Sequence, residues 1–460
     1  MSIKQQYRSL YSFDEIDNIK EHLESIQRKA EDIFNEKYLE PKEDEYLMVR
    51  KLILNFIRDR KRIIYGGYAQ NELIKMKNVK DDFYGKCRAD IEFYSPEPIK
   101  DLIELCDIIN EKKVFNVKGD EGVHPETYKL FANFENYADI SYMDPNIFKN
   151  CPYIENDGLR FCHPHFMLVD GYRVYTDPMT SYFRLDKAFS RFMTLEKNYP
   201  IPKVENSMVK YEQYLDKKIH DEIMRNIRKL IIMNSKFVVV GHYGVEYLTK
   251  KADIEIGNYP YYQLITTNLD EDYLKIYNIL KSVYGKNISY RKYYKFFMFW
   301  DNRIEFYYDK QVILKLYGNN ERCVVYQYSD KKKTHFGTFQ LIMLYLLIDY
   351  NYAKVYKYKH DESNYLIMMN LLYKAKDEYL EQNNLTLVEP SNFQHFTLQC
   401  MGTPVDPIRE SRIKGLERLK QGKSFKFSYI PQDGKKGKVP EFKFNNSSGL
   451  MIDTSKKIEK

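Results

Sequence analysis

The sequence predicts an α+β fold, in which helices cover a mixed β-sheet and a second, degenerate unit of the same kind follows. Three observations predict it. Strand-like and helix-like segments alternate between residues 60 and 145 in the order strand, helix, strand, helix, strand, strand. Two adjacent glycines, Gly66 and Gly67, separate the first strand from the first helix. A weaker copy of this arrangement recurs between residues 236 and 330.

The N-terminal third supplies the clearest elements. Ser12 and Glu15 form a capping box that opens a helix with one apolar stripe, and Pro41 interrupts the helical pattern. Further segments are predicted in chain order: a helix at 43–58, a strand at 63–65, a helix after the glycine pair, a strand at 88–95, a helix at 99–113 and two strands within 126–144.

The copy begins at the segment "KFVVVGHYGVEYLTKKADIEIGNYP", residues 236–260. A valine-rich strand runs into Gly241, and the tetrapeptide "ADIE" of 89–92 recurs at 252–255. The second glycine is replaced by His242, and no clear third aspartate follows. Asp253 and Glu255 are therefore either a second active site or a structural remnant of one. Helices are predicted at about 337–385, and the last 50 residues are basic and less patterned.

Composition bounds the class of protein. The chain has 460 residues, enough for two or three domains, with 43% apolar and 30% charged residues, as in ordinary globular proteins. The net charge of +7 is compatible with a nucleic-acid partner. The six cysteines are scattered without a C-x-x-C pair, which predicts neither a disulfide framework nor a zinc ribbon. We find no signal-peptide pattern, and the longest apolar run, 341–348, is too short to span a membrane, so we expect an intracellular protein without a membrane partner.

Three acidic residues carry the predicted chemistry. Asp90 and Glu92 lie two apart in a predicted strand, so their carboxylates share one face of the sheet. Asp139 is a third acid inside an otherwise apolar strand. Like charges placed together are costly unless a cation lies between them. Acids from neighbouring strands behind a glycine turn that could hold a triphosphate indicate a two-metal nucleotidyl-transfer site.

The roles follow from charge. Asp90 and Glu92 would bind two Mg²⁺ ions, and Asp139 would help hold the catalytic metal and take the proton from an attacking 3′-hydroxyl. The amides of Gly66 and Gly67 and the N-terminus of the following helix would face the triphosphate. No P-loop motif lies near the glycine pair.

At these residues the chain resembles the nucleotidyltransferase superfamily of the DNA polymerase β type. It is most similar to the poly(A) polymerase catalytic subunits of poxviruses and other large DNA viruses. The resemblance is carried by "YGGYAQNEL", "ADIEFYS" and "YADISYMD". It implies ATP as donor, an RNA 3′ end as acceptor and Mg²⁺ or Mn²⁺ as cofactor. Its acids map onto Asp90, Glu92 and Asp139, with glutamate where the family usually has aspartate. The implied activity is template-independent addition of AMP to viral mRNA, in the cytoplasmic viral factory and, if packaged, in the virion.

The resemblance also implies a division into domains. We expect a helical segment at 1–60, a catalytic nucleotidyltransferase domain at 61–195, a degenerate nucleotidyltransferase-like domain with helices at 196–385, and a basic C-terminal region at 386–460 with a mobile tail.

Other motifs leave alternatives open. Arg184, Lys187 and Arg191 form one basic helical face that could hold ATP phosphates or be solvated. The "CHPHF" motif at 162–166 gives only a weak indication of zinc. The segment "YRKYYKFFMFW", 290–300, could stack bases or form a core strand. The basic segments 330–335 and 412–438 could contact RNA phosphates or be partnerless surface lysines.

Alternative functions also stay open. Tailing enzymes that use UTP or CTP, and synthases of cyclic or 2′–5′ oligonucleotides, would carry the same acids, and a non-catalytic RNA-binding scaffold could keep the same fold. A homodimer or a separate processivity subunit could extend the basic track for RNA, although no interface is evident in the sequence.

Overall fold

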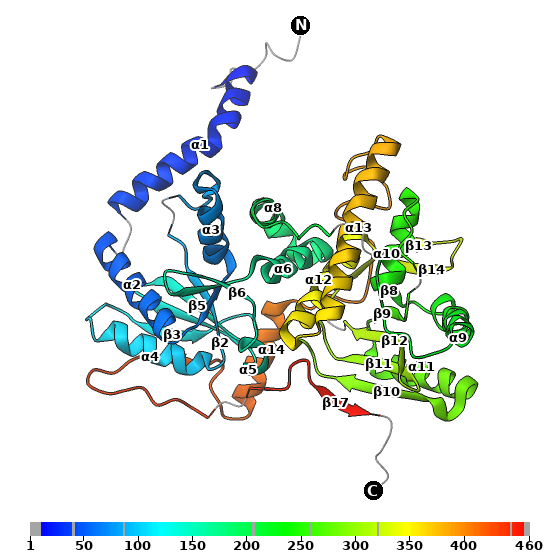
Figure 1. Ribbon diagram of the computed structural model, residues 1–460. Helices are drawn as coiled ribbons and strands as arrows, with labels where there is room; N and C mark the ends of the chain where they lie inside the picture. The colour runs from blue at the N-terminus through cyan, green and yellow to red at the C-terminus, as the bar shows by residue number, and fades with distance from the viewer. Residues whose placement is uncertain are drawn as a thin grey trace.

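Two mixed β-sheets, one in each half of the chain, form the framework of the protein (Figure 1). The computed structural model describes residues 11–38, 42–85, 88–204, 208–257, 259–319, 322–441 and 444–454. Among the helices of these residues, none is long and apolar enough to cross a membrane.

The first sheet has the strand order β16-β3-β4-β5-β2-β1-β7-β6. Its strands are β1 (Ile63–Tyr65), β2 (Ile91–Ser95), β3 (Lys118–Glu121), β4 (Thr127–Ala132), β5 (Glu135–Tyr142), β6 (Tyr153–Asn156), β7 (Leu159–Cys162) and β16 (Ser428–Tyr429). The predicted strands of this region are confirmed, and β3, β6 and β7 are additions that the sequence patterns did not indicate.

The second sheet has the strand order β15-β13-β14-β8-β9-β12-β11-β10-β17. Its strands are β8 (Val238–Val240), β9 (Tyr262–Thr266), β10 (Ile288–Tyr293), β11 (Arg303–Tyr308), β12 (Gln311–Gly318), β13 (Val324–Ser329), β14 (Thr334–Gly337), β15 (Cys400–Met401) and β17 (Met451–Thr454).

The two sheets share one topology. In the first, β1 runs antiparallel to β2 and parallel to β7, β2 runs parallel to β5, and β5 runs antiparallel to β4. In the second, β8 runs antiparallel to β9 and parallel to β14, β9 runs parallel to β12, and β12 runs antiparallel to β11. The strands β1 to β7 thus correspond one by one to β8 to β14, as expected for an internal duplication.

Helices cover the sheets in matching positions. In the first half α3 packs on β1 and β2, and α4 packs on β3 to β5; in the second half α10 packs on β8 and β9, and α11 packs on β10 and β12. The helices are α1 (Phe13–Lys37), α2 (Glu43–Asp59), α3 (Gly66–Lys77), α4 (Pro98–Asn110), α5 (Pro145–Phe148), α6 (Pro164–Thr176), α7 (Pro178–Ser181), α8 (Leu185–Asn198), α9 (Lys217–Leu230), α10 (Gly241–Thr249), α11 (Leu269–Tyr284), α12 (Phe339–Tyr356), α13 (Lys359–Asn383) and α14 (Pro407–Lys420).

The two halves share part of their core. Helix α6 of the first half packs along α12 of the second, and one buried apolar cluster extends from α2 and the first sheet into α12 and α13. Phe296, Phe299 and Trp300 belong to this cluster but lie outside a strand, whereas β10 ends at Tyr293 and is only partly buried. The predicted core strand at 290–300 is therefore a strand in its first half and core in its second half. A separate cluster fills the second sheet between α9 and α11.

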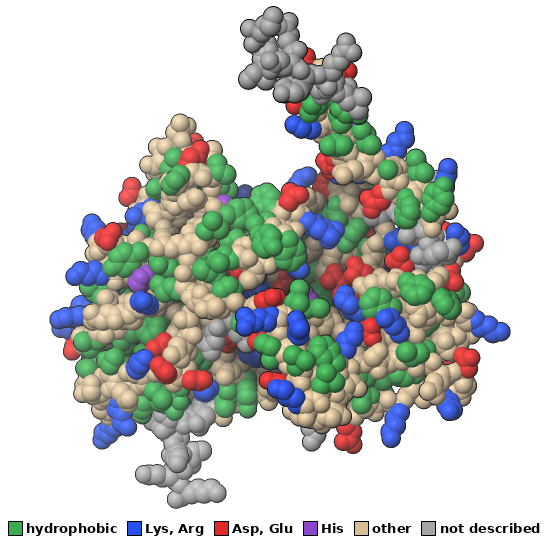
Figure 2. Space-filling view, turned by 180° about the vertical axis from the view of Figure 1, so that it is seen from behind, with side chains coloured by type: hydrophobic (Ala, Val, Ile, Leu, Met, Phe, Trp, Pro, Cys, Tyr) green, Lys and Arg blue, Asp and Glu red, His purple; other side chains and the backbone are tan. Residues whose placement is uncertain are grey.

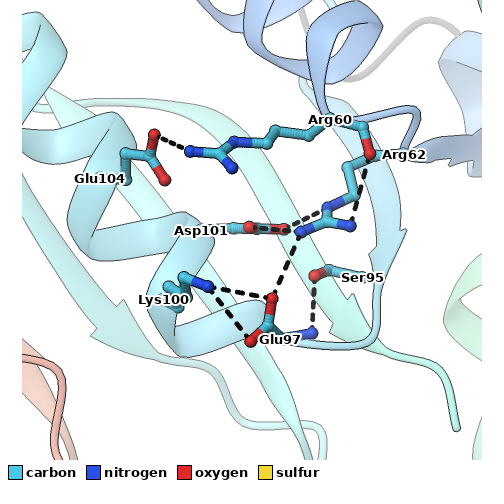
Figure 3. A network of polar contacts seen from close by, with 7 residues as sticks. All are labelled: Arg60, Arg62, Ser95, Glu97, Lys100, Asp101 and Glu104. Atoms are coloured by element: carbon cyan, nitrogen blue, oxygen red, sulfur yellow. Dashed lines mark hydrogen bonds and ion pairs between the residues drawn. The ribbon is translucent and has the colours of Figure 1, made fainter. Parts of the chain in front are cut away.

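A buried ion pair anchors the first strand to α4 (Figure 3). The guanidinium of Arg62, directly before β1, donates to both carboxylate oxygens of Asp101 at 2.7 and 2.8 Å. Asp101 is 1% exposed, so its charge depends on this partner. Arg60 pairs with Glu104 one turn further along α4. These contacts fix where β1 begins, and hence where the glycine turn after it lies.

Helix α1 confirms its predicted capping box, because the Ser12 hydroxyl accepts from the Glu15 N–H and the Glu15 carboxylate accepts from the Ser12 N–H. It extends away from the rest of the molecule (Figure 1). Its apolar stripe, including Leu23 and Ile26, is exposed to solvent.

The C-terminal region is less detached than its sequence indicates. Strand β16 extends the first sheet at β3, and β17 extends the second sheet at the equivalent strand β10. Cys323, directly before β13, forms a disulfide with Cys400 in β15, which the scattered cysteine spacing did not predict. The predicted mobile tail, about the last dozen residues, includes the ordered strand β17, and residues 455–460 of this tail lie outside the described residues, as does Cys87.

Candidate active site

The glycine pair sits at the junction of β1 and α3. Gly66 has a φ of +70°, a conformation that favours glycine. A Cβ on Gly66 would lie 1.8 Å from Oε2 of Glu92, so the close approach of this side chain also requires glycine. A Cβ on Gly67 would lie 2.3 Å from the Tyr84 hydroxyl and 2.7 Å from Nη1 of Arg191. The turn thus brings bare backbone against charged and polar side chains.

Glu92 lies over this turn. Its carboxylate accepts a hydrogen bond of 2.8 Å from the Gly67 N–H, at the N-terminus of α3. Burial raises the pKa of Glu92 to about 7, and the negative charge of Asp90 adds to the rise, while the Gly67 N–H opposes it. The side chain that the sequence placed in a metal site therefore lies where the triphosphate is expected to approach.

Asp139 is adjacent to Glu92 across the sheet, because β2 and β5 pair in parallel with these two residues in register. Asp90 lies immediately before β2 rather than inside it. The amide of Asn136 donates to both aspartates, at 3.3 Å to Asp90 and 3.0 Å to Asp139. Burial raises the pKa of Asp90, and the charge of Asp139 adds to it. The structure thus brings all three predicted acids together.

Lys129 provides a cation at this cluster. Strands β4 and β5 form a hairpin whose turn residues Asn133 and Phe134 both have positive φ, and this hairpin sets Lys129 opposite Asp139. The Lys129 ammonium donates to both oxygens of Asp139, at 2.9 and 2.7 Å. The sequence prediction missed Lys129 and Asn136, and the hairpin spacing was the signal that could have found Lys129.

The predicted basic residues border the same cluster from α8. The positive charge of Lys187 opposes the burial that raises the pKa of Asp90. Arg184 lies directly before α8 rather than on it, and its guanidinium lies over the Phe183 ring at 5.0 Å, so the predicted basic face is reduced to Lys187 and Arg191. Arg191, from the same predicted face, comes closest to the glycine turn and stacks on the rings of Phe83 and Tyr84 at 4.7 and 4.8 Å.

The donor set suits a hard divalent cation, since three carboxylates supply oxygen ligands and two of them have raised pKa values in each other's field. As the side chains stand, no group of three or more His, Cys, Asp and Glu in the described part of the chain is arranged to hold a metal ion. The reason is visible in the contacts: Asp139 binds Lys129, and Glu92 binds the Gly67 N–H.

The equivalent place in the second half has lost this chemistry. Gly241 keeps the positive φ, +60°, and a Cβ there would lie 1.9 Å from Oε1 of Gln263. Gln263 pairs with Val240 and Lys315 as Glu92 pairs with Tyr65 and Asp139. An amide and a lysine therefore replace two acids.

Asp253 and Glu255 are not the counterparts of the first acid pair. Both are exposed and lie between α10 and β9, outside the strand, and Asp253 has a φ of +55°. The recurrence of "ADIE" is thus a local coincidence, although the duplication around it is present in the topology.

The "CHPHF" motif has a structural role. His163 caps the N-terminus of α6 by accepting from the His165 N–H, and burial lowers the pKa of His163 to about 3. Nε2 of His165 lies 3.1 Å from the carbonyl oxygen of Pro200, and Cys162 is buried.

Known proteins match this chain over almost its whole length. The family described as "Poly(A) polymerase catalytic subunit" matches residues 51–181, and the family described as "APMV, Putative poly(A) polymerase, catalytic subunit, C-terminal" matches residues 194–459. A protein of Acanthamoeba polyphaga mimivirus named "Putative poly(A) polymerase catalytic subunit" is 31% identical over 98% of this chain and 83% of its own length. A protein of the same name from African swine fever virus (strain Badajoz 1971 Vero-adapted) is 31% identical over 34% of each chain. The crystal structure of the Megavirus polyadenylate synthase superposes with a TM-score of 0.91 at 30% identity, covering 98% of this chain and 95% of that one.

The duplicated fold and these matches define the class of protein as a nucleotidyltransferase. Within this class, the chain belongs to the poly(A) polymerase catalytic subunits of giant DNA viruses.

Proposed function

We propose that the chain adds AMP from ATP to the 3′-hydroxyl of viral mRNA without a template, using Asp90, Glu92 and Asp139. The observation that carries the proposal is the gathering of these three acids beside the Gly66-Gly67 turn, at the N-terminus of α3. Acids beside a backbone anion site suit a reaction that moves a phosphoryl group.

The triphosphate would lie against the glycine turn and the N-terminus of α3, where backbone N–H groups and the helix dipole favour an anion. Arg191 would contribute the nearest positive charge, since its guanidinium already lies against Gly67. Lys187 extends the basic face of α8 toward Asp90. Arg184, exposed directly before α8, adds positive charge toward solvent. The Gly67 N–H, which now donates to Glu92, would donate to the incoming phosphate instead.

Asp90, Glu92 and Asp139 would together hold two Mg²⁺ or Mn²⁺ ions. When bound, these ions supply Lewis-acid stabilisation of the charge that develops on the transferred phosphoryl group. Asp139 would accept the proton of the attacking 3′-hydroxyl. Asn136, which already bridges Asp90 and Asp139, would keep the two carboxylates in place.

The RNA would lie between the two halves. Figure 2 shows a face on which the surface is hollowed between them, with acidic and basic side chains along the hollow. Cations gather at the turn between β13 and β14: burial lowers the pKa of Lys332, and the positive charges of nearby Arg228 and Lys250 lower it further. Such clustering favours a polyanion. Within 412–438, Arg418 and Lys426 pair with Glu121 and Asp120, so other basic residues of this segment would meet RNA.

We also propose that the chain works with a further subunit or a second copy of itself. The relatives are named as catalytic subunits, which indicates an assembly in those proteins. A partner that extends the basic track would keep the RNA bound between additions.

Primer extension with each of the four NTPs tests the proposal. The full chain, an RNA primer and Mg²⁺ or Mn²⁺ should give extension with ATP far above that with UTP, CTP or GTP. Asp90→Ala should abolish extension while RNA binding, measured by fluorescence anisotropy, survives. Preference for UTP or CTP, or formation of cyclic or 2′–5′ products without primer growth, would replace the assignment of substrate. RNA binding without any incorporation would identify a scaffold.

A further inference from the structure

The acid cluster contains a cation of its own. Lys129 forms an ion pair with one of the three carboxylates, that of Asp139, and its ammonium contacts both oxygens at 2.7 and 2.9 Å. An ammonium that donates two hydrogen bonds to Asp139 neutralises the charge of this carboxylate, as a metal ion would. An oxygen that accepts from the Lys129 ammonium is a weaker metal ligand, because the ammonium neutralises the carboxylate charge and repels a second cation.

The second half shows the same pair with its charges exchanged. Glu305 lies at the position of Lys129, Lys315 lies at the position of Asp139, and the two are paired in register across β11 and β12. Nζ of Lys315 lies 3.8 Å from Oε1 of Glu305. In the second half, which has lost the acids, a positively charged lysine, Lys315, thus stands where Asp139 would face a metal ion.

The two pairs differ in how far solvent reaches them. The Lys315 and Glu305 side chains are 11% and 8% exposed, and Arg303 and Tyr307 also bind Glu305, so this pair is enclosed. The Lys129 and Asp139 side chains are 33% and 16% exposed. Lys129 can therefore move its ammonium into water more readily than Lys315 can, because its pair is partly open to solvent, while Asn136 continues to hold Asp139.

We infer that Lys129 is a positioning residue that holds Asp139 until a divalent cation arrives, and that it competes with that cation for the carboxylate. The inference rests on the proposed function of Asp139. It gives Lys129 two effects that a purely structural lysine would not combine: it stabilises the metal-free protein, and it weakens metal binding.

Lys129→Met and Lys129→Arg test this in the full chain. Lys118→Met is the matched control, because Lys118 pairs with Asp120 at 3.2 Å on the neighbouring strand β3. Mn²⁺ affinity is measured by titration calorimetry without substrate, and thermal unfolding is measured with and without Mn²⁺. Lys129→Met should bind Mn²⁺ on the order of tenfold more tightly, since an opposite charge at this distance shifts a carboxylate's affinity by at least that factor. It should unfold at a lower temperature without metal and gain more from Mn²⁺ than the unaltered chain. Lys129→Arg and Lys118→Met should resemble the unaltered chain.

A second measurement uses the unaltered chain, in case Lys129→Met does not fold. Lysine acylation is followed by mass spectrometry with and without Mn²⁺, and the modification of Lys129 should increase when Mn²⁺ is present, because the ammonium is released from Asp139. Modification that stays the same, or Mn²⁺ affinity that is unchanged or weaker in Lys129→Met, would overturn the inference. If the chain extends RNA normally in that case, the proposed function stands without it. If Lys129 competes with Mn²⁺ but no RNA is extended, the proposed function fails instead. Absence of any Mn²⁺ binding contradicts both.

Discussion

Gln263 lies at the position in the second sheet that Glu92 occupies in the first. Each is the second residue of the strand expected to carry the acids, each approaches the positive-φ glycine of its half, and each is in register with one residue of the first strand and one of the parallel strand. Gln263 is uncharged and 1% exposed, and it donates to Asp349 at 2.8 Å. The duplicated unit thus keeps the shape of the turn and replaces its charges with a buried polar network.

Gly66→Ala should abolish activity and destabilise the chain. The new Cβ would meet the Glu92 carboxylate at 1.8 Å, and the φ of +70° disfavours alanine in addition. Gly85→Ala is the matched control, because Gly85 also has a positive φ, +55°, but nothing lies within 4 Å of its Cβ position.

Primer extension and thermal unfolding of the two alanine variants distinguish the effect of backbone strain, which both variants have, from the clash with Glu92, which only Gly66→Ala has. Gly85→Ala should retain activity and lose only a small amount of stability. Equal losses in the two variants would mean that the approach of Glu92 to the turn is unimportant.

Arg303→Met should destabilise the chain by about 3 kcal/mol, the low end of the range for breaking a buried ion pair, because Glu305 would keep Lys315, at 3.8 Å, as a positive partner. Arg303 is 3% exposed and lies 3.1 Å from Glu305. Urea unfolding followed by circular dichroism measures the change. The exposed pair of Arg28 and Glu24 on α1 provides the comparison, and Arg28→Met should leave the urea midpoint unchanged. A midpoint unaffected by Arg303→Met would show that the network around Glu305 is not a structural replacement for the lost site.

The unfolding free energy should fall in acid partly because of His242. Burial lowers the pKa of His242 to about 4, from an ordinary value of 6.5. Between pH 6.5 and pH 4 the unfolded chain takes up a proton that the folded chain does not, so stability is lost as the pH falls through this window. His242→Gln should reduce the loss, and His22→Gln, on the exposed helix α1, should not. Unfolding curves at a series of pH values measure it, and identical pH profiles for the His242→Gln variant and the unaltered chain would contradict the prediction.

Arg191→Leu should raise the KM for ATP by about tenfold or more, because a hydrogen bond to a charged group is worth about 1.5 to 3 kcal/mol. The Arg191 guanidinium lies against Gly67, where the phosphates are expected. Lys197→Leu, on the same helix but paired with Asp81, is the control. Steady-state extension at varied ATP concentrations distinguishes them. An unchanged KM for ATP in Arg191→Leu would place the phosphates elsewhere.

The sequence patterns that predicted the site are local. The glycine pair, the alternation around Asp90 and Glu92, and the acid within an apolar strand each depend on a few neighbouring residues, and the structure brings them together. Lys129 is opposite Asp139 through the spacing of the β4–β5 hairpin, and Asn136 reaches Asp139 from the same strand, where the pairing with β4 is irregular; period-two alternation alone indicates neither contact. The recurrence of "ADIE" at 252–255 wrongly indicated a second acid pair, because a local sequence match does not show whether the residues lie in the corresponding strand. The residue two before Gln263 is Tyr261, so the true counterpart of Asp90 has no acidic signature. The disulfide between Cys323 and Cys400 joins residues 77 apart, a pairing that only the fold brings together.

The central claim is that the acids of the first half, and not those of its degenerate copy, carry out AMP transfer. The most direct measurement is single-turnover incorporation of AMP into an RNA primer by two matched variants, Asp90→Asn and Asp253→Asn. Both change the aspartate of an "ADIE" tetrapeptide to its neutral isostere, and asparagine tolerates the positive φ of Asp253. We predict that Asp90→Asn loses at least a hundredfold in rate while Asp253→Asn retains the rate of the unaltered chain. Equal activity in the two variants, or loss in Asp253→Asn alone, would contradict the account.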